Sequence, residues 1–150
     1  MELPEGVKGV IFDLDGTLAD FPIDYEAMRK ELKGLAAERG LVSDFSPLVD
    51  EIRRIATTSG FLKRLLAVVD KHEVRSVSAA KPKNDVIKFY QACLKAGFRV
   101  AILTRNGRLM TEEFLRRFNL GMPAAICSRR RSGARARLRS LLVHHFRQLV

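Results

Sequence analysis

The stretch VIFDLDGTLAD, residues 10–20, decides the fold of this chain. An apolar run leads into two aspartates, Asp13 and Asp15, and Gly16 follows at once. The apolar, β-branched residues of Val7–Phe12 predict a short buried strand. The glycine permits a sharp turn directly after that strand. The strand therefore brings two carboxylates to one small volume at the point where the chain turns.

Helices and buried strands alternate along the rest of the chain. Helices are predicted at 24–39, 46–57, 61–71, 85–96 and 109–118, strands at 99–103 (RVAIL) and 124–127, and a turn at 81–84. This alternation is typical of an α/β fold with a Rossmann-like parallel sheet and flanking helices. Because such sheets bind ligands at the carboxyl ends of their strands, we expect Asp13, Asp15 and Thr104 at one edge.

The composition indicates a single domain with room for a small insertion, since 150 residues are 47% hydrophobic. No apolar run approaches the ~20 residues of a membrane helix, and the N-terminus has no signal core. Cys93 and Cys127 lack metal-site spacing, so reduced thiols are expected. We therefore expect a cytoplasmic protein without a membrane partner.

The net charge of +10 is unevenly distributed. Residues 1–113 hold 18 basic and 17 acidic side chains, a net charge of +1. Residues 114–150 hold nine arginines and no acid, a net charge of +9. The chain therefore combines two compositions, and the basic one lies at the C-terminal end.

The two aspartates suit phosphoryl chemistry with a divalent cation. Like charges repel, and Mg²⁺ commonly binds one or two carboxylates together with phosphate oxygens. One carboxylate then attacks phosphorus while the other transfers a proton. Thr104 and backbone amides are candidates to hold the phosphate. The plain alternatives are a solvated strand exit for the Asp-x-Asp-Gly turn and a strand-end hydroxyl for Thr104.

Two motifs resemble a known family. FDLDGTLAD, beginning at Phe12, resembles the first motif of the haloacid dehalogenase superfamily, and AILTRN, beginning at Ala101, resembles the second. The resemblance covers about residues 7–127 and is nearest to the phosphoglycolate phosphatase-like members. It implies a Mg²⁺-dependent phosphatase-type hydrolase that acts on a small phosphorylated metabolite through an aspartyl-phosphate.

The resemblance also implies residue roles. Asp13 is the nucleophile and a metal ligand, and Asp15 is the general acid/base and offers its backbone carbonyl to the metal. The phosphate is expected to contact Thr104, Arg105, Asn106 and the turn at Gly16.

The same resemblance implies the domain boundaries. Residues 1–19 and 81–127 are expected to form the Rossmann-like core. Residues 20–80 are expected to form a small helical cap. Residues 128–150 remain as a basic, atypical tail.

The chain departs from the family pattern after about residue 127. The family supplies a basic residue, usually Lys, after the second motif and an acidic motif at the end of the next strand. No Lys follows Lys95 and no acid follows Glu113. Residues 129–131, all Arg, are candidates to replace the Lys. We expect a truncated or altered fold without its C-terminal strands, which leaves Val7–Phe12 as an exposed edge and stability marginal.

The tail has three interpretations: a helix that binds nucleic acid or an anionic surface, a solvated helix, or out-of-frame translation. Nucleic acid is the less favoured partner because no aromatic platform interrupts the arginines. The alternative functions are a non-catalytic phosphate-binding remnant and binding of nucleic acid or an anionic surface through the Arg-rich tail. The sequence gives no signal for an oligomeric state.

Overall fold

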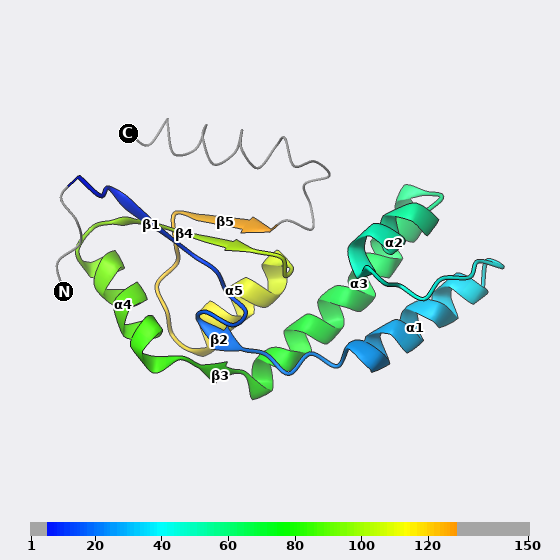
Figure 1. Cartoon of the computed structure of the whole chain (residues 1–150), viewed down its shortest axis with the longest axis horizontal. Coiled ribbons are helices and arrows are strands. Elements are labelled where there is room, and N and C mark those ends of the chain that lie inside the picture. The colour runs from blue at the N-terminus through cyan, green and yellow to red at the C-terminus, as the bar shows by residue number, and fades with distance from the viewer. Residues whose placement is uncertain (1–5, 129–150) are drawn as a thin grey trace. The chain divides into compact units, whose positions relative to one another are not determined.

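The predicted strands form one parallel sheet in the computed structural model, which describes residues 6–128 (Figure 1). Its strands are β1 (Gly9–Phe12), β4 (Arg99–Thr104) and β5 (Ala125–Ser128), in the order β1-β4-β5. Both pairings are parallel. The α/β fold class predicted from the sequence is therefore confirmed.

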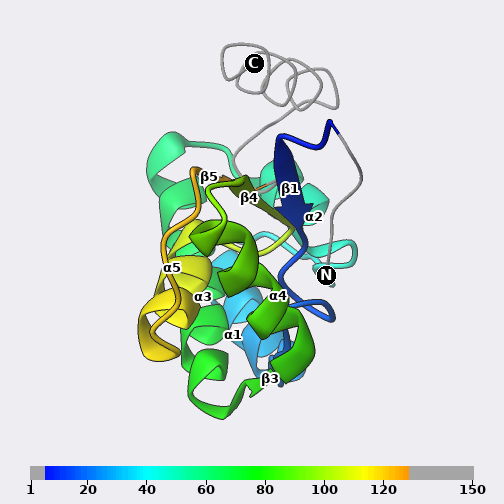
Figure 2. The ribbon, with the colours of Figure 1, turned by 90° about the vertical axis from the view of Figure 1, so that its left-hand side faces the viewer.

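Two helices cover the same face of this sheet (Figures 1 and 2). They are α4 (Asn84–Lys95), which packs on β4, and α5 (Arg108–Arg117), which packs on β5. The chain crosses the sheet in one direction, and right-handed crossovers then place both helices on one side. Both helices begin and end within one residue of their predicted bounds.

The end of β1 is fixed by aromatic packing. The ring of Phe12 makes edge-to-face contacts with Phe89 and Tyr90 of α4, with centroids 5.7 Å and 5.3 Å apart. Tyr90 is fully buried, and its hydroxyl group donates a hydrogen bond of 2.6 Å to the carbonyl of Gly121. These contacts hold the residue that precedes Asp13, and they anchor the segment that leads into β5.

Strand β1 lies at an edge of the sheet formed by residues 6–128, because it pairs only with β4. The side chain of Ile11 is 45% exposed although it is large and apolar. An edge strand of this kind offers unpaired backbone groups to other chains. The exposed edge expected from the sequence is present in this part of the chain.

We predict that Ile11→Lys lowers aggregation during thermal unfolding without raising the unfolding temperature, because a charge on an edge strand disfavours strand pairing between chains. Light scattering recorded during a temperature ramp measures this. Val42→Lys is the matched control, since Val42 is also an exposed apolar residue (90%) but belongs to a loop. Equal suppression by both variants would exclude the β1 edge as the route of aggregation.

A short ribbon corrects one sequence prediction. The segment at 81–84 was predicted as a turn, but β3 (Lys81–Pro82) pairs antiparallel with β2 (Ala19–Asp20). Two-residue strands carry no hydrophobic periodicity, so the pattern gave no signal for them. The chain leaves and re-enters the sheet unit, defined as residues 6–21 and 80–128, next to this ribbon.

The helical unit, Pro22–Ala79, is inserted between the two parts of the sheet unit. Its elements are α1 (Tyr25–Ala37), α2 (Leu48–Ile55), α3 (Ser59–Ser76) and a 3₁₀ turn, η1 (Val77–Ala79). The side chain of Asp24 caps α1 by accepting the N–H of Ala27, as the sequence predicted. Helix α3 is longer than the predicted 61–71 at both ends.

The core of the helical unit comes from all three helices and one loop. Fully buried side chains at its centre are Met28, Leu32, Phe45, Ile52, Phe61 and Leu65. Tyr25, the first residue of α1, is 44% exposed and lies outside this core. No helix within residues 6–128 is both long and apolar enough to cross a bilayer.

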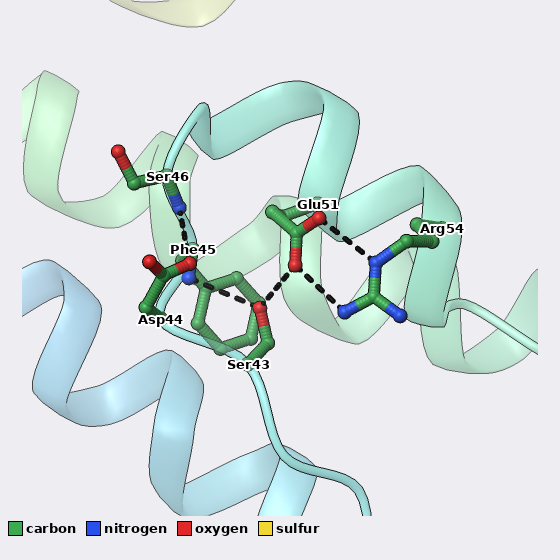
Figure 3. A network of polar contacts seen from close by, with 6 residues as sticks. All are labelled: Ser43, Asp44, Phe45, Ser46, Glu51 and Arg54. Carbon is green, nitrogen blue, oxygen red and sulfur yellow. Dashed lines mark hydrogen bonds and ion pairs between the residues drawn. The ribbon is translucent and has the colours of Figure 1, made fainter.

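A polar network fixes the loop that carries Phe45 into this core (Figure 3). The hydroxyl of Ser43 donates to Glu51 at 2.7 Å and accepts the N–H of Phe45 at 3.0 Å. Arg54 donates two hydrogen bonds of 2.8 Å to the same carboxylate. Phe45 has a positive φ of 56°, which a bulky residue adopts only when its surroundings enforce it. The network therefore supports a strained but fully buried aromatic residue.

We predict that this network makes stability depend on pH. Hydrogen bonds from Arg54, and then Ser43, lower the pKa of Glu51 from 4.5 to about 2. A lowered pKa means that the stabilisation is complete above pH 4.5 and is lost as the pH falls toward 2. The gap in thermal midpoint between the wild type and Glu51→Gln should therefore narrow over this interval, as followed by circular dichroism.

Asp50→Asn is the matched control, because Asp50 lies in the same first turn of α2. It removes a favourable charge near the helix N-terminus but leaves the contacts to Ser43 and Arg54 in place. If the wild type and Glu51→Gln lose stability in parallel between pH 5 and pH 2, the network does not carry this pH dependence.

Candidate active site

The carboxyl ends of β1 and β4 form one edge of the sheet. The register pairs Phe12 with Ile102, so the residues that follow both strands lie together. A hollow of about 370 Å³ opens at this edge. Its lining residues come from the two strand ends: Ile11, Phe12, Asp13, Leu103, Thr104 and Arg105.

Asp13 presents one oxygen to the protein and leaves the other uncommitted. Its Oδ1 accepts the N–H of Leu14 at 2.8 Å. No other hydrogen bond to this carboxylate arises from residues 6–128. Leu14 is fully buried, so the donor that orients Asp13 is itself anchored in the core. The arrangement orients the carboxylate, while its second oxygen accepts no hydrogen bond from residues 6–128.

The turn after β1 holds Asp15. The carbonyl of Leu14 accepts the N–H groups of residues 17–19, and the N–H of Gly16 donates to Ala19 at 2.8 Å. Gly16 has φ +80°, a conformation that L side chains rarely adopt, which accounts for glycine at this position. The backbone N–H of Phe21 donates to the carboxylate of Asp15. The turn therefore closes on itself and orients its own acid.

The pKa of Asp15 is raised, first because the surrounding protein removes water from the carboxyl group. The N–H of Phe21 opposes this, the negative charges of Asp13 and Asp20 add to it, and the charge of Arg105 opposes it. A raised pKa makes a carboxyl group a better proton donor near neutral pH. Asp13 and Asp15 are thus placed in different environments, as separate roles require.

Thr104 is 2% exposed and is tied to Asn106, which is 7% exposed. The hydroxyl of Thr104 donates to Asn106 Oδ1 at 3.0 Å and accepts the N–H of Asn106 at 3.1 Å. Ser128 at the end of β5 donates to the carbonyl of Asn106 at 2.6 Å. The loop after β4 is therefore held from two strands. The sequence reasoning did not single out Ser128, although its place at the end of a third strand was a usable signal.

Lys83 is a second residue that sequence reasoning missed. Its ammonium donates to the carbonyl of Gly16 at 2.7 Å and lies 3.1 Å from the carboxylate of Asp20. Its own backbone N–H donates to the carbonyl of Leu18 at 3.0 Å. Three contacts from one residue thus hold the turn that carries Asp15. The side chain of Asp20 is 60% exposed, so this acid is solvated as well as paired with Lys83.

The oxygen ligands available at this edge of the sheet are compatible with Mg²⁺. Among residues 6–128, no group of three or more His, Cys, Asp or Glu side chains is arranged to hold a metal ion. Mg²⁺ usually keeps several waters and takes only one or two carboxylates plus substrate phosphate. Asp13 and Asp15, whose like charges repel at this edge, fit that mode of binding.

The residues predicted for the site fall into two groups. Asp13, Thr104 and Arg105 line the hollow, and Asn106 supports Thr104 from behind. Gly16 has both its N–H and its carbonyl engaged within the turn and by Lys83. The candidate replacements at 129–131, and the whole basic tail beyond Ser128, lie outside the described residues.

A model of one protein family matches this chain over residues 10–145, under the description haloacid dehalogenase-like hydrolase. The chain belongs to that family. The match includes both motifs identified from the sequence and continues past residue 127. No curated protein matches the chain.

One solved structure supports the fold, and two others are similar at a lower level. CbbY from Rhodobacter sphaeroides, solved in complex with phosphate, matches with a TM-score of 0.60 and 16% identity over 94% of this chain and 73% of that chain. A hydrolase of the same superfamily, subfamily IA, from Geobacter sulfurreducens PCA matches with a TM-score of 0.48 and 16% identity over 93% and 73%. A phosphonoacetaldehyde hydrolase-like protein from Oleispira antarctica gives 0.48 and 18% over 81% and 53%.

We predict that Lys83→Met loosens the turn after β1 without unfolding the protein. The ion pair to Asp20 is exposed, so its loss should cost at most about 1 kcal/mol. Hydrogen exchange at the amides of residues 16–19 should accelerate, since the contact to the Gly16 carbonyl is removed. Lys88→Met, an exposed lysine of α4, is the control. Unchanged exchange at 16–19 in Lys83→Met would contradict the role given to Lys83.

Proposed function

We propose that this chain is a Mg²⁺-dependent phosphatase-type hydrolase of the phosphoglycolate phosphatase-like kind, acting on a small phosphorylated metabolite in the cytoplasm. The observation that carries the proposal is the hollow at the carboxyl edge of the sheet, which Asp13, Thr104 and Arg105 line together. A nucleophilic carboxylate, a hydroxyl and a cation around one space are the groups that phosphoryl transfer requires.

Asp13 is the nucleophile in this proposal. Because the N–H of Leu14 binds Oδ1, the other oxygen, Oδ2, attacks phosphorus and the bond between phosphorus and the ester oxygen breaks. The product on the protein is an aspartyl-phosphate. A water then attacks the same phosphorus, inorganic phosphate leaves, and the Asp13 carboxylate is restored.

Asp15 carries the proton in both steps. Its carboxyl group protonates the departing alcohol oxygen in the first step. In the second step the resulting carboxylate takes a proton from the attacking water, so the proton count closes over one cycle. The raised pKa and the orienting N–H of Phe21 support this assignment.

The phosphoryl oxygens are received by the loop after β4. Thr104 offers its hydroxyl once Asn106 releases it, and the backbone amides of Arg105 and Asn106 add donors. Gly16 contributes the bend of the opposing turn, since its own N–H already donates to Ala19. The carboxylate of Asp13 and the backbone carbonyl of Asp15 would hold Mg²⁺, which would supply positive charge that lowers the repulsion between the nucleophile and the anionic substrate.

The helical unit is proposed to act as the cap that selects the substrate. It is inserted directly after the turn that carries Asp15, between β2 and β3. An insertion at this point joins the catalytic turn through a short connection, and loops and insertions near a sheet edge commonly determine specificity.

The test is hydrolysis of p-nitrophenyl phosphate with Mg²⁺. The wild type should release p-nitrophenol above the buffer rate, and Asp13→Asn should lower kcat/KM by about a thousandfold or more. Asp85→Asn, which removes an exposed carboxylate of α4, is the control and should retain activity. A wild type that does not exceed Asp13→Asn would overturn the proposed turnover.

A second candidate is a phosphate-binding protein without turnover. The observation that favours it is the site's two carboxylates, with no third metal-ligating side chain beside them in residues 6–128. Such a protein would bind inorganic phosphate by isothermal titration calorimetry and release no product. Binding of nucleic acid or an anionic surface would depend on the tail, which lies outside the described residues.

A further inference from the structure

We propose that the side chain of Arg105 is the resident cation of this site and that its guanidinium binds the phosphoryl group opposite Asp13. The inference rests on the proposed function and deepens it. Arg105 is the one basic residue among the six that line the hollow. Asp13 and Thr104, the residues assigned to attack and to phosphate binding, line the same space.

The neighbouring basic residues have other partners. Lys83 is bound to the Gly16 carbonyl and to Asp20. Arg108 donates to Glu112 at 2.6 Å within α5. Within residues 6–128, Arg105 has neither a hydrogen bond nor an ion pair of its own. Among the basic residues described at this edge, Arg105 is therefore the cation that remains free to meet an anionic ligand.

The charge of Arg105 reaches the acidic side of the site. It acts on the carboxyl group of Asp15 and opposes the effect of Asp13 and Asp20 on its pKa. Within residues 6–128, Arg105 is the arginine whose charge acts on this acidic group, while Lys83 is already paired with Asp20. An incoming phosphate needs a favourable electrostatic partner among these negative charges, and Arg105 supplies it.

The backbone beneath Arg105 is well supported although its side chain is exposed. Thr104 and Asn106 on either side are buried and bonded to each other. Ser128 holds the same loop from β5. A planar guanidinium on a fixed loop binds phosphate through two parallel hydrogen bonds, with less ordering cost than a lysine ammonium. The geometry thus assigns Arg105 a direct role through its side chain in addition to its amide.

The experiment measures binding and turnover separately in the full chain with Mg²⁺. The variants are Arg105→Met, which keeps the length and removes the charge, and Arg105→Lys, which keeps the charge and removes the fork. Arg108→Met is the matched control, because it removes an exposed arginine three residues away. Circular dichroism establishes that each variant is folded.

Isothermal titration with inorganic phosphate should give a Kd at least about tenfold higher for Arg105→Met than for the wild type. Arg105→Lys should fall between the two, and Arg108→Met should match the wild type. With p-nitrophenyl phosphate, Arg105→Met should lower kcat/KM by at least the same factor. An intermediate value for Arg105→Lys separates the loss of charge from the loss of the bidentate fork.

The outcomes separate this inference from the proposed function. If the wild type hydrolyses the ester and Arg105→Met binds phosphate and turns over equally well, the role of Arg105 is excluded and the phosphatase proposal stands. If the wild type binds phosphate without hydrolysis and Arg105→Met loses binding, the role of Arg105 is supported and turnover fails. A wild type that neither binds nor hydrolyses overturns both.

Discussion

The parallel register between β1 and β4 is the constraint on which the site depends. Pairing Phe12 with Ile102 places Asp13 and Thr104 at the ends of adjacent strands, although 91 positions separate them in the sequence. A slip of one residue would turn every side chain of β1 to the opposite face. Phe12 prevents this, because its ring is buried against α4 while Ile11 faces outward. The packing of one aromatic residue thus sets the geometry of the edge formed by the carboxyl ends of β1 and β4.

The turn after β1, which carries Asp15, and the loop after β4 are supported in different ways. The turn after β1 closes through its own backbone hydrogen bonds, with Leu14 and Leu18 as buried anchors. The loop after β4 relies on side chains. Thr104 is hydrogen-bonded to the side chain of Asn106, and the hydroxyl of Ser128 donates to the Asn106 carbonyl. Both supports are rigid while the side chains of Asp13 and Arg105 stay exposed, and the proposed active site needs this combination.

The sequence predicts the parts of this structure that local patterns encode. The continuous apolar run of β4 and the amphipathic spacing of α4 and α5 are sufficient to predict these three elements, because burial dictates both patterns. The two aspartates were placed at a sheet edge because parallel strands share their carboxyl ends. In the helical unit, the helix predicted from residue 24 begins at Tyr25, and the side chain of Asp24 caps it.

What the sequence does not predict depends on long-range contacts. The ammonium of Lys83 binds a carbonyl 67 residues earlier, and no local pattern records that partner. The ribbon of β2 and β3 exists through four residues paired across the insertion, too few to show periodicity. The positive φ of Phe45 arises from burial and from the Ser43 and Glu51 network, in opposition to its intrinsic preference.

The ribbon of β2 and β3 also has a consequence for how such a molecule can evolve. Because Ala19 faces Pro82 and Asp20 faces Lys81, the helical insertion departs and returns at neighbouring points. Insertions whose ends lie close together can be lengthened, shortened or replaced with little disturbance to the host fold. The register of β1 and β4 does not depend on what lies between residues 22 and 79. The sheet edge proposed as the active site and the inserted helices can therefore diverge as separate modules, with the ribbon as their junction.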